Sequence, residues 1–335
     1  MKVLKIAAVI CALAVAASLC GCDIMDGDSS LSSRVDSSLQ SSDGALESIF
    51  DLSEPMDDIL SEESSEMSEV EEDLSSHSEL SLPSEPEEEF SSEASAAMST
   101  DFNEIGALDG TSNGWGPGVN RSEDGRPIAP VTFQEKYGKY AVDFIRPEKG
   151  VIYLTFDEGY ENGYTPKILD VLKEKEVPAV FFVTLSYAKN NPELIQRMID
   201  EGHIVGNHSA THPDMTSLSL QEAHDDVKKL HDYMLENFNY KMTLFRFPMG
   251  CYSERTLALL ESMGYRSIFW SFAYKDWETD NQPDPTAAYS KITDFAHDGA
   301  IYLLHAVSST NTNILGNVID NFREQGYVLE AYPNK

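Results

Sequence analysis

Short apolar runs alternate with amphipathic stretches through the last two thirds of this 335-residue chain. The runs are rich in Val, Ile, Leu and Phe and are nearly continuous, which is typical of strands buried on both faces of a sheet. We expect strands at 151–156, 179–184, 204–207, 243–247, 266–271, 300–305 and 327–330. Because helical patterns separate them, the sequence predicts an α/β fold with a parallel sheet.

Start signals place helices between these strands. Thr165-Pro166 offers an N-cap and a first-turn proline, and Asn191-Pro192 opens the next helix. Ser219 and Glu222 form a capping box before a long helix. Further helices are expected at about 254–263, 286–297 and 314–324. Seven strands with intervening helices favour a (β/α) barrel one unit short of eight, although an open doubly wound sheet would give a similar pattern.

Five short clusters each stand where an expected strand ends. They are Thr155-Phe156-Asp157-Glu158-Gly159, His208-Ser209-Ala210-Thr211-His212, Arg246-Phe247-Pro248-Met249-Gly250, Lys275-Asp276-Trp277 and Leu303-Leu304-His305. Side chains at the carboxyl ends of parallel strands meet at one mouth of a barrel, so residues far apart in the chain can share a site. We therefore expect one site at this mouth.

The residue types in the first three clusters suit metal-assisted hydrolysis. His208 and His212 are four positions apart, so on a helical turn their imidazoles would share one side and hold one cation. Histidines at this spacing are also common as surface or cap residues. Asp157, at an equivalent strand end, would orient and deprotonate a bound water. Arg246 either makes an ordinary ion pair or keeps Asp157 ionised.

The last two clusters suit proton donation. His305 closes an apolar strand, where a hydrogen-bonded core histidine is the default. Asp276 would hold one imidazole nitrogen and leave the other to donate a proton. Trp277 and Leu303 are either core residues or the walls of an apolar slot for a small acyl group.

In order and spacing, the five clusters resemble the motifs of the polysaccharide deacetylase domain (NodB-homology, carbohydrate esterase family 4) over about 150–332. The stretches 154–163, 246–248 and 272–277 are most similar to the delta-lactam-biosynthetic de-N-acetylase branch, which removes acetyl groups from muramic residues of peptidoglycan. The resemblance implies a distorted (β/α)7 barrel. It also implies a hydrolase of non-peptide carbon–nitrogen bonds that acts on peptidoglycan glycan strands and releases acetate.

The resemblance assigns roles to individual positions of this sequence. It makes Asp157 the catalytic base and Arg246 the arginine that orients the base. It makes His305 the general acid and Asp276 the aspartate that tunes this acid. The metal histidines are His208 and His212. Among the substrate-binding residues, the backbone near Met249 supplies the oxyanion donor, and Trp277 and Leu303 line the acetyl pocket. Tyr160 and Asn162 of the first motif complete this group.

One position departs from the family pattern. Most of the family has a second Asp that completes an Asp-His-His metal triad, where this chain has Glu158. The longer side chain either reaches the ion as a third ligand or points away and leaves two histidines and waters. We expect an active enzyme with a looser metal site; the alternative is a catalytically impaired carbohydrate-binding or wall-sensing lipoprotein. Zinc is the default metal, and cobalt, nickel, iron or manganese also suit these ligands.

The front of the chain indicates export. Two lysines precede an apolar run at 6–19, which is too short for a mature membrane span but typical of a signal-peptide core. The run ends in Leu19-Cys20-Gly21-Cys22, which has the shape of a lipobox. We expect a signal peptide at 1–21 and a lipid on Cys22 that tethers the chain to the outer face of a bacterial membrane, facing the cell wall. A plain secretory peptide is the alternative.

The segment that follows is dominated by Ser, Glu and Asp. Between 23 and about 104, Arg34 is the only Lys or Arg. Such a tract buries too little apolar surface to offset its ordering entropy, so we expect an extended, disordered linker over 22–110. Most of the formal charge of −33 falls here, and so acidic a protein is a poor candidate for nucleic-acid binding.

The remaining chain divides into an N-terminal extension at 111–149 and the deacetylase domain at 150–335. About 225 residues from 111 onward suffice for a hydrophobic core. Loss of the signal peptide and lipidation of Cys22 would leave Cys251 alone, which excludes an intramolecular disulfide. We expect a monomer.

Overall fold

The computed structural model describes residues 100–333, so the expected signal peptide, Cys22 and most of the acidic linker lie outside the described residues. Within that range, the centre is an eight-stranded parallel sheet in the order β10-β3-β4-β5-β6-β8-β2, with β9 also paired to β3. Its strands are β2 Val142–Asp143, β3 Val151–Glu158, β4 Ala179–Val183, β5 Ile204–Asn207, β6 Leu244–Phe245, β8 Arg266–Ile268, β9 Ala300–His305 and β10 Val328–Leu329.

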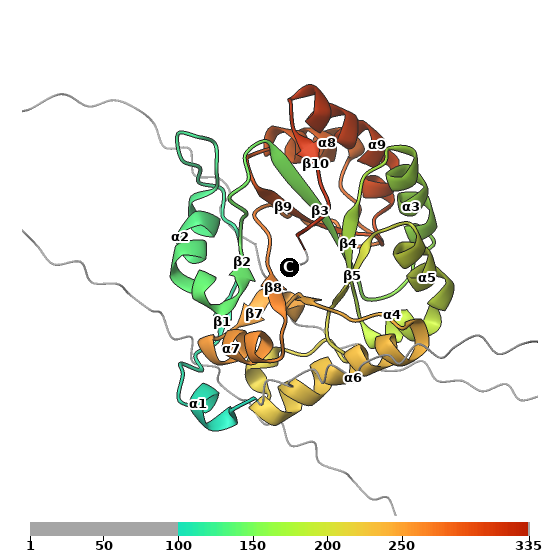
Figure 1. The fold of residues 1–335 in the computed structure, drawn as a ribbon. Helices are drawn as coiled ribbons and strands as arrows, with labels where there is room; N and C mark the ends of the chain where they lie inside the picture. The colour runs from blue at the N-terminus through green and yellow to red at the C-terminus, as the bar shows by residue number, and fades with distance from the viewer. Residues whose placement is uncertain (1–99, 334–335) are drawn as a thin grey trace, which may run out of the picture. The chain divides into compact units, whose positions relative to one another are not determined.

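The sheet curls into a distorted barrel. Figure 1 shows the strands around a central axis, with α3, α5, α6, α7, α8 and α9 on the outside. Beyond β8 the chain turns toward β9, where the Ser271 N–H donates to the Ile301 carbonyl at 2.9 Å and Phe272 forms a parallel bridge with Tyr302. The curl and this bridge favour the barrel over the open doubly wound sheet.

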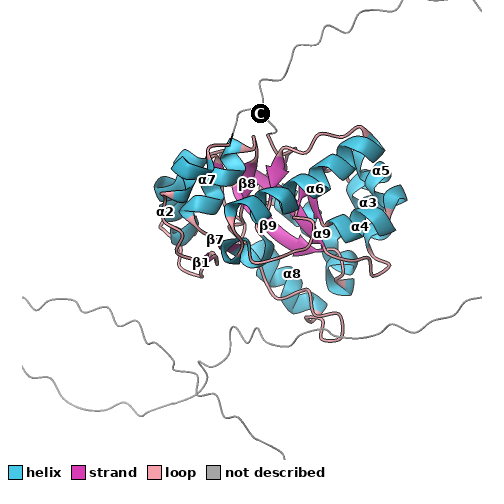
Figure 2. Ribbon diagram, turned by 90° about the horizontal axis from the view of Figure 1, so that it is seen from below, coloured by secondary structure: helices cyan, strands magenta, loops and turns pink. Residues whose placement is uncertain are grey.

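Helices cover the outside of the sheet (Figure 2). In the described range they are α1 Phe102–Gly106, α2 Ile128–Tyr137, α3 Thr165–Glu174, α4 Leu185–Asn190, α5 Pro192–Asp200, α6 Leu220–Phe238, α7 Glu254–Ser262, α8 Pro285–Asp294 and α9 Ser309–Glu324. The capping box of α6 is confirmed, since the Glu222 N–H donates to the Ser219 hydroxyl at 3.2 Å and the Ser219 N–H to the Glu222 carboxylate at 2.8 Å. The predicted cap of α3 is wrong, because Tyr164 is the N-cap and Thr165 is already helical.

Alternation along the strands divides the core into two layers. One small cluster takes residues from five strands and the C-terminal segment, and therefore fills the inside of the curl: Val151, Tyr153, Val180, Phe182, Leu244, Ile268, Ile301 and Tyr332. The larger cluster holds the intervening residues, such as Ile152, Leu154 and Phe156 of β3, and packs against the helices. Odd-numbered residues of β3 thus face the barrel interior and even-numbered ones the helices.

The segment at 111–149 packs on the barrel. Trp115 is buried, and its indole Nε1 donates to the Trp270 carbonyl at 3.0 Å. Phe144 stacks on Phe269 with ring centroids 4.5 Å apart. A small antiparallel pair joins β1, Asn113–Gly114, to β7, Cys251–Tyr252. The extension therefore packs against Trp270 and against the segment that follows β6, and it supports the mouth of the barrel there.

Ordered structure begins before residue 111, inside the stretch that the sequence assigned to the linker. Asp101 caps α1 by accepting from the Asn103 N–H at 2.9 Å, and Ile105 of this helix is buried. These few residues bury apolar surface against the folded domain, which the acidic composition before them does not predict.

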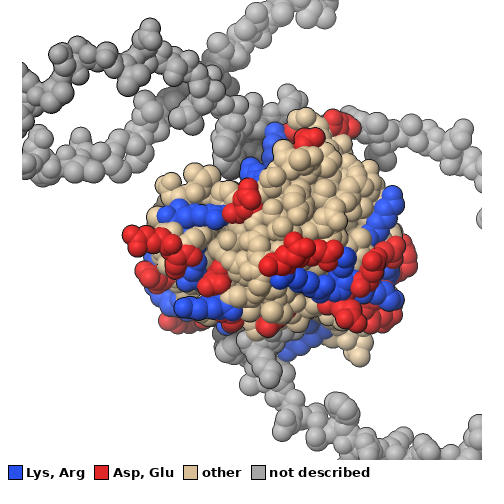
Figure 3. All heavy atoms as spheres, turned by 90° about the horizontal axis from the view of Figure 1, so that it is seen from above, with Lys and Arg blue, Asp and Glu red and all other residues tan. Residues whose placement is uncertain are grey.

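Acidic and basic side chains are interspersed on the face seen in Figure 3, around an expanse of uncharged residues. Such mixing keeps the local electrostatic field small.

Within the described part of the chain, none of the helices combines the length and apolar character that a membrane crossing needs.

Candidate active site

A buried carboxylate and guanidinium lie at the mouth of the barrel. Asp157, on β3, is only 8% exposed, and Arg246, just after β6, is fully buried. The Arg246 Nη1 donates to Asp157 Oδ1 at 2.7 Å, its Nε donates to the Ile268 carbonyl at 3.1 Å, and its guanidinium lies 4.2 Å above the Phe182 ring. Burial alone would raise the pKa of Asp157, but the charge of Arg246 outweighs it and holds that pKa below its ordinary value. The carboxylate is therefore ionised.

His208 follows β5 and lies beside this carboxylate. Its Nδ1 is 2.9 Å from the Arg246 carbonyl, which can only accept, so Nδ1 carries the proton and Nε2 carries a lone pair. Nε2 is 3.5 Å from Asp157 Oδ2. Burial lowers the pKa of His208 to about 4, so the ring is neutral near pH 7 and this contact is not an ion pair. Two acceptors thus face each other, an arrangement that a cation stabilises.

His212 completes the pair, with its ring centroid 4.8 Å from that of His208. The helical turn expected for this motif is wrong, because residues 208–212 form a loop. Ser209 has φ 69° and His212 has φ 55°, and these left-handed conformations turn the chain back on itself. The Ser209 N–H donates to the Asn207 side chain at 2.8 Å and the His212 N–H to the Ser209 hydroxyl at 2.8 Å. A tight loop, rather than helical periodicity, brings the imidazoles together.

The donor set fits a divalent cation held by two imidazoles. Neutral histidine with one nitrogen bonded to a backbone carbonyl is the usual form of a metal ligand, because that bond fixes the ring. Among residues 100–333, however, no group of three or more His, Cys, Asp or Glu side chains is arranged to hold a metal ion. The chain supplies His208 and His212, beside the Asp157 carboxylate, and leaves the other coordination positions to water and substrate.

Glu158 does not join the histidine pair. It alternates with Asp157 along β3 and therefore faces the helix layer, where the Thr165 hydroxyl is 3.5 Å from both of its carboxylate oxygens. Burial, with the nearby charge of Glu161, raises the pKa of Glu158 well above its ordinary value. The extra methylene of Glu cannot offset a side chain that points to the other face of the strand, so the structure does not place a third ligand here.

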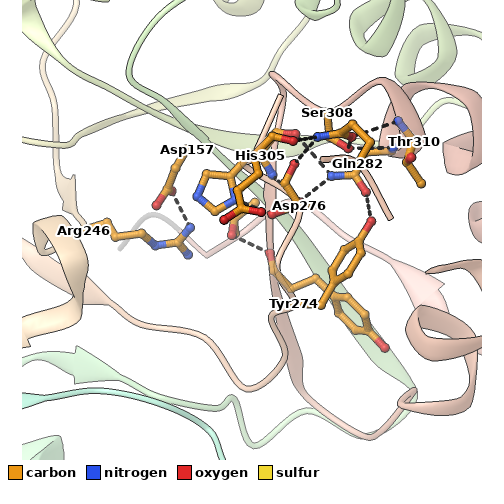
Figure 4. A network of polar contacts seen from close by, with 12 residues as sticks. Asp157, Arg246, Tyr274, Asp276, Gln282, His305, Ser308 and Thr310 are labelled. Atoms are coloured by element: carbon orange, nitrogen blue, oxygen red, sulfur yellow. Dashed lines mark hydrogen bonds and ion pairs between the residues drawn. The ribbon is translucent and has the colours of Figure 1, made fainter. Parts of the chain in front are cut away.

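A second pair, a partly exposed histidine and a buried aspartate, lies beside Asp157 on the neighbouring strand. His305 ends β9 and is the register partner of Asp157 on β3. Its Nδ1 donates to Asp276 Oδ1 at 2.7 Å, and its backbone N–H donates to Asp276 Oδ2 at 2.8 Å (Figure 4). Burial alone would lower the pKa of His305, but the charge and hydrogen bond of the fully buried Asp276 outweigh it and raise that pKa. The raised pKa favours the protonated ring, and Nε2 is left for proton transfer.

The two expected acetyl-pocket residues differ in exposure. Trp277 is 47% exposed, so it is not a core residue, and its ring meets the His305 ring edge-on at 5.4 Å. Leu303 is buried on β9, two residues before His305 and therefore on the same face of the strand. Trp277 thus contacts the His305 ring, and Leu303 shares its face of β9.

The other expected substrate residues lie in exposed loops. Met249 is 48% exposed, within the 3₁₀ turn Pro248–Gly250, and has φ 56°. Tyr160 is exposed after β3, and the exposed Asn162 side chain donates to the Val307 carbonyl at 3.2 Å. This last bond ties the first-motif loop to the loop after His305.

Sequence reasoning missed several residues that support the two pairs. Phe182 lies under Arg246 and Trp270 lies 5.7 Å from its guanidinium, and strand alternation alone would have placed both inside the barrel. Asn311 donates to Asp276 Oδ2 at 2.6 Å. No local pattern signals this contact, because the two residues are 35 positions apart.

Comparison with known proteins identifies the family of this chain. Residues 145–268 match the family model for polysaccharide deacetylase. Over 198 residues the chain is 42% identical to the "Peptidoglycan-N-acetylmuramic acid deacetylase PdaA" of Bacillus subtilis (strain 168), covering 59% of this chain and 74% of that protein. The chain belongs to the polysaccharide deacetylase family. It is therefore an enzyme of this family, as the motifs indicated.

Solved structures confirm the fold of this polysaccharide deacetylase. The structure of Bacillus subtilis PdaA, a family 4 carbohydrate esterase, is similar with a TM-score of 0.63 and 38% identity, covering 67% of this chain and 96% of that one. A family 4 carbohydrate esterase from Bacillus anthracis is similar with a TM-score of 0.54 and 39% identity, covering 67% and 96% respectively. The distorted (β/α)7 barrel is thereby confirmed.

Proposed function

We propose that this polysaccharide deacetylase is a metal-dependent hydrolase that removes N-acetyl groups from peptidoglycan, with N-acetylmuramic acid as its target sugar, and releases acetate. The observation that carries the proposal is the arrangement of three side chains at the mouth. An ionised Asp157 faces the neutral His208, and His305, whose pKa is raised, lies on the neighbouring strand. The identity to a protein named as an N-acetylmuramic acid deacetylase supports the choice of sugar.

His208 and His212 would hold the cation. When bound, a divalent metal polarises the acetyl carbonyl and lowers the pKa of a water to about 7. We propose zinc for this site, and cobalt, nickel, iron and manganese are the other metals that imidazole with oxygen ligands suits.

The remaining steps belong to the chain's own residues. Asp157 Oδ2, the oxygen that Arg246 does not engage, accepts a proton from the attacking water. A backbone N–H near Met249 donates to the oxyanion, and one such donor is worth about 3 kcal/mol in other hydrolases. His305 Nε2 then donates its proton to the leaving amine, so the carbon–nitrogen bond breaks and acetate is released.

The test is acetate release from muropeptides by the wild type, Asp157→Asn and His208→Ala, each with and without a chelator. Both variants and chelation should lower the rate by at least about a hundredfold, because base and metal act on the same water. The exposed Asp225 on α6 offers a matched control, and Asp225→Asn should keep the wild-type rate. Near-normal turnover by Asp157→Asn would refute the assignment.

We also propose that the protein is exported and lipid-anchored through Cys22, facing the glycan strands of the wall. The support is the sequence itself, in the apolar run at 6–19 and the lipobox-like Leu19-Cys20-Gly21-Cys22. Incorporation of labelled fatty acid by the wild type and its loss in Cys22→Ser is the expected result. Equal labelling of both would contradict the anchor.

A further inference from the structure

We propose that Asn311, in the first turn of α9, is a positioning residue that fixes the Asp276 carboxylate beneath His305; this inference rests on the proposed deacetylase function. Asn311 is only 2% exposed. Its Nδ2 donates to Asp276 Oδ2 at 2.6 Å and to the His305 carbonyl at 3.2 Å. One amide thus contacts both members of the acid pair.

The orientation of this amide is determined by its partners. A carboxylate oxygen can only accept, so the amide nitrogen of Asn311 must face Asp276. The amide oxygen then accepts from the buried Tyr274 hydroxyl. The backbone is also fixed, because the Asn311 N–H donates to the Ser308 hydroxyl at 3.1 Å. Asn311 therefore presents a donor to Asp276 in one defined direction.

Both oxygens of Asp276 are engaged in this arrangement. Oδ1 accepts from the His305 ring, and Oδ2 accepts from the His305 backbone and from Asn311. Rotation of the carboxylate would break these bonds, and an unpaired buried acceptor is costly. Since the carboxylate plane is fixed, the orientation of the imidazole that donates to it is also fixed. Asn311 therefore sets the direction of His305 Nε2 through Asp276, and this role needs no contact between Asn311 and the substrate.

A second amide joins the loop of Asp276 to the start of α9. The Gln282 Nε2 donates to the Asp276 carbonyl at 2.9 Å. Its Oε1 accepts from the Ser308 hydroxyl at 2.5 Å and from the Thr310 N–H at 3.3 Å (Figure 4). The loop that carries the acid's partner and the helix turn that carries Asn311 are therefore held together.

This geometry makes a prediction that depends on the leaving group. Departure of an amine from the tetrahedral intermediate needs a proton from His305, whereas an aryl oxide leaves without one. If Asn311 acts through His305, its loss should slow hydrolysis of the N-acetyl glycan far more than hydrolysis of an aryl acetate. A residue that only maintains the fold would affect both substrates alike.

The experiment measures kcat and KM of the full chain on N-acetylated glycan and on 4-nitrophenyl acetate. Asn311→Leu keeps the approximate size of the side chain but removes the donor, and Asn311→Ala removes the side chain beyond Cβ. In each, kcat on glycan should fall about tenfold, the equivalent of one hydrogen bond to a charged group, with KM and the ester rate changed by less than about twofold. Asn313 is exposed on the same helix, and Asn313→Ala should match the wild type.

Two further measurements decide the matter if the Asn311 variants fold poorly. Tyr274→Phe removes only the hydroxyl that engages the amide oxygen, and should lower kcat on glycan in the same selective way. Proton NMR of the His305 Nδ1–H should show faster exchange in Asn311→Ala and Tyr274→Phe than in Asn313→Ala. Equal slowing of both substrates, a change confined to KM, or unchanged exchange would overturn the inference. A wild type that releases no acetate from glycan would instead refute the proposed function, and this inference with it.

Discussion

At the scale of single residues, the site depends on two carboxylates whose surroundings differ. Asp157 has an arginine as its partner and a lowered pKa, so it is available as a base. Asp276 is paired with His305, whose pKa it raises, so that imidazole is available as an acid. Opposite shifts of this kind allow base and acid to be in their active forms at the same pH.

The first prediction concerns the pH profile. The rate should fall as pH rises through the pKa of His305, which lies above the ordinary value of about 6.5. In Asp276→Asn the charge that raises this pKa is lost while burial still lowers it, so the alkaline limb of kcat/KM should move to lower pH. A limb that stays in place would show that another group is the acid.

The second prediction concerns Arg246. Arg246→Met leaves Asp157 buried without its counter-charge, so the free energy of unfolding should fall by about 3–5 kcal/mol and activity should be lost. Adding Asp157→Asn removes the unpaired charge and should recover most of the stability but none of the activity. Denaturant unfolding of the single and double variants measures this, and additive losses of stability would contradict a direct pair.

The sequence placed these residues because each closes an apolar strand, where a charged side chain is conspicuous. Asp157, Arg246 and His305 could therefore be predicted one by one. Asn311 could not, since its role exists only through contacts with residues distant in the chain.

At the scale of elements, strand alternation decides what each motif can do. Residues 157 and 158 are neighbours in sequence but face opposite layers of the barrel. The motif pattern alone left both orientations of Glu158 open. The path of β3, which the sequence did predict, separates them once the interior face is known.

The third prediction follows from this separation. Glu158→Gln keeps the shape of a side chain that faces Thr165, so zinc affinity measured by calorimetry should change by less than about twofold, whereas His212→Ala should weaken it by more than about tenfold. A large loss of zinc affinity in Glu158→Gln would show that Glu158 is a metal ligand.

The fourth prediction compares the same substitution in two elements. A Cβ on Gly206 of β5 would stand 2.4 Å from the Phe182 ring, which is buried under Arg246 and cannot withdraw. Gly206→Ala should therefore cost about 1–3 kcal/mol of stability. In α9, Gly316→Ala meets only ordinary contacts at 3.7 Å and should stabilise by up to about 1 kcal/mol. Thermal unfolding distinguishes them, and equal effects would contradict the tight packing inside the barrel.

Several short strands and the first turn of α9 escaped prediction because the sequence carries little signal for them. The strands β1, β2 and β7 have two residues each, too few for any periodicity. The first turn of α9 is rich in Ser, Thr and Asn, which favour caps over helix interiors, so the sequence began this helix at 314 instead of Ser309. Bonds from Gln282 to Ser308 and Thr310 support that turn, and they are visible only in the fold.

At the scale of the whole molecule, the curl of the sheet turns scattered motifs into one site. The ends of β3, β5, β6 and β9 carry the proposed base, the histidine pair, the arginine and the proposed acid, and the extension at 111–149 supports the mouth through Trp115. The alternation of strands and helices predicted an α/β fold but left a barrel and an open sheet as alternatives, and only the family resemblance distinguished them in favour of the barrel. The closure beyond β8 and the packing of the extension depend on tertiary contacts.

The central claim is N-deacetylation of peptidoglycan at this mouth. The most direct measurement is mass spectrometry of purified muropeptides after incubation with the zinc-loaded protein. The account predicts loss of one acetyl group, located by fragmentation on the muramic residue, and no loss with Asp157→Asn. Muropeptides that keep every acetyl group with the wild type, or lose them equally with Asp157→Asn, would contradict it.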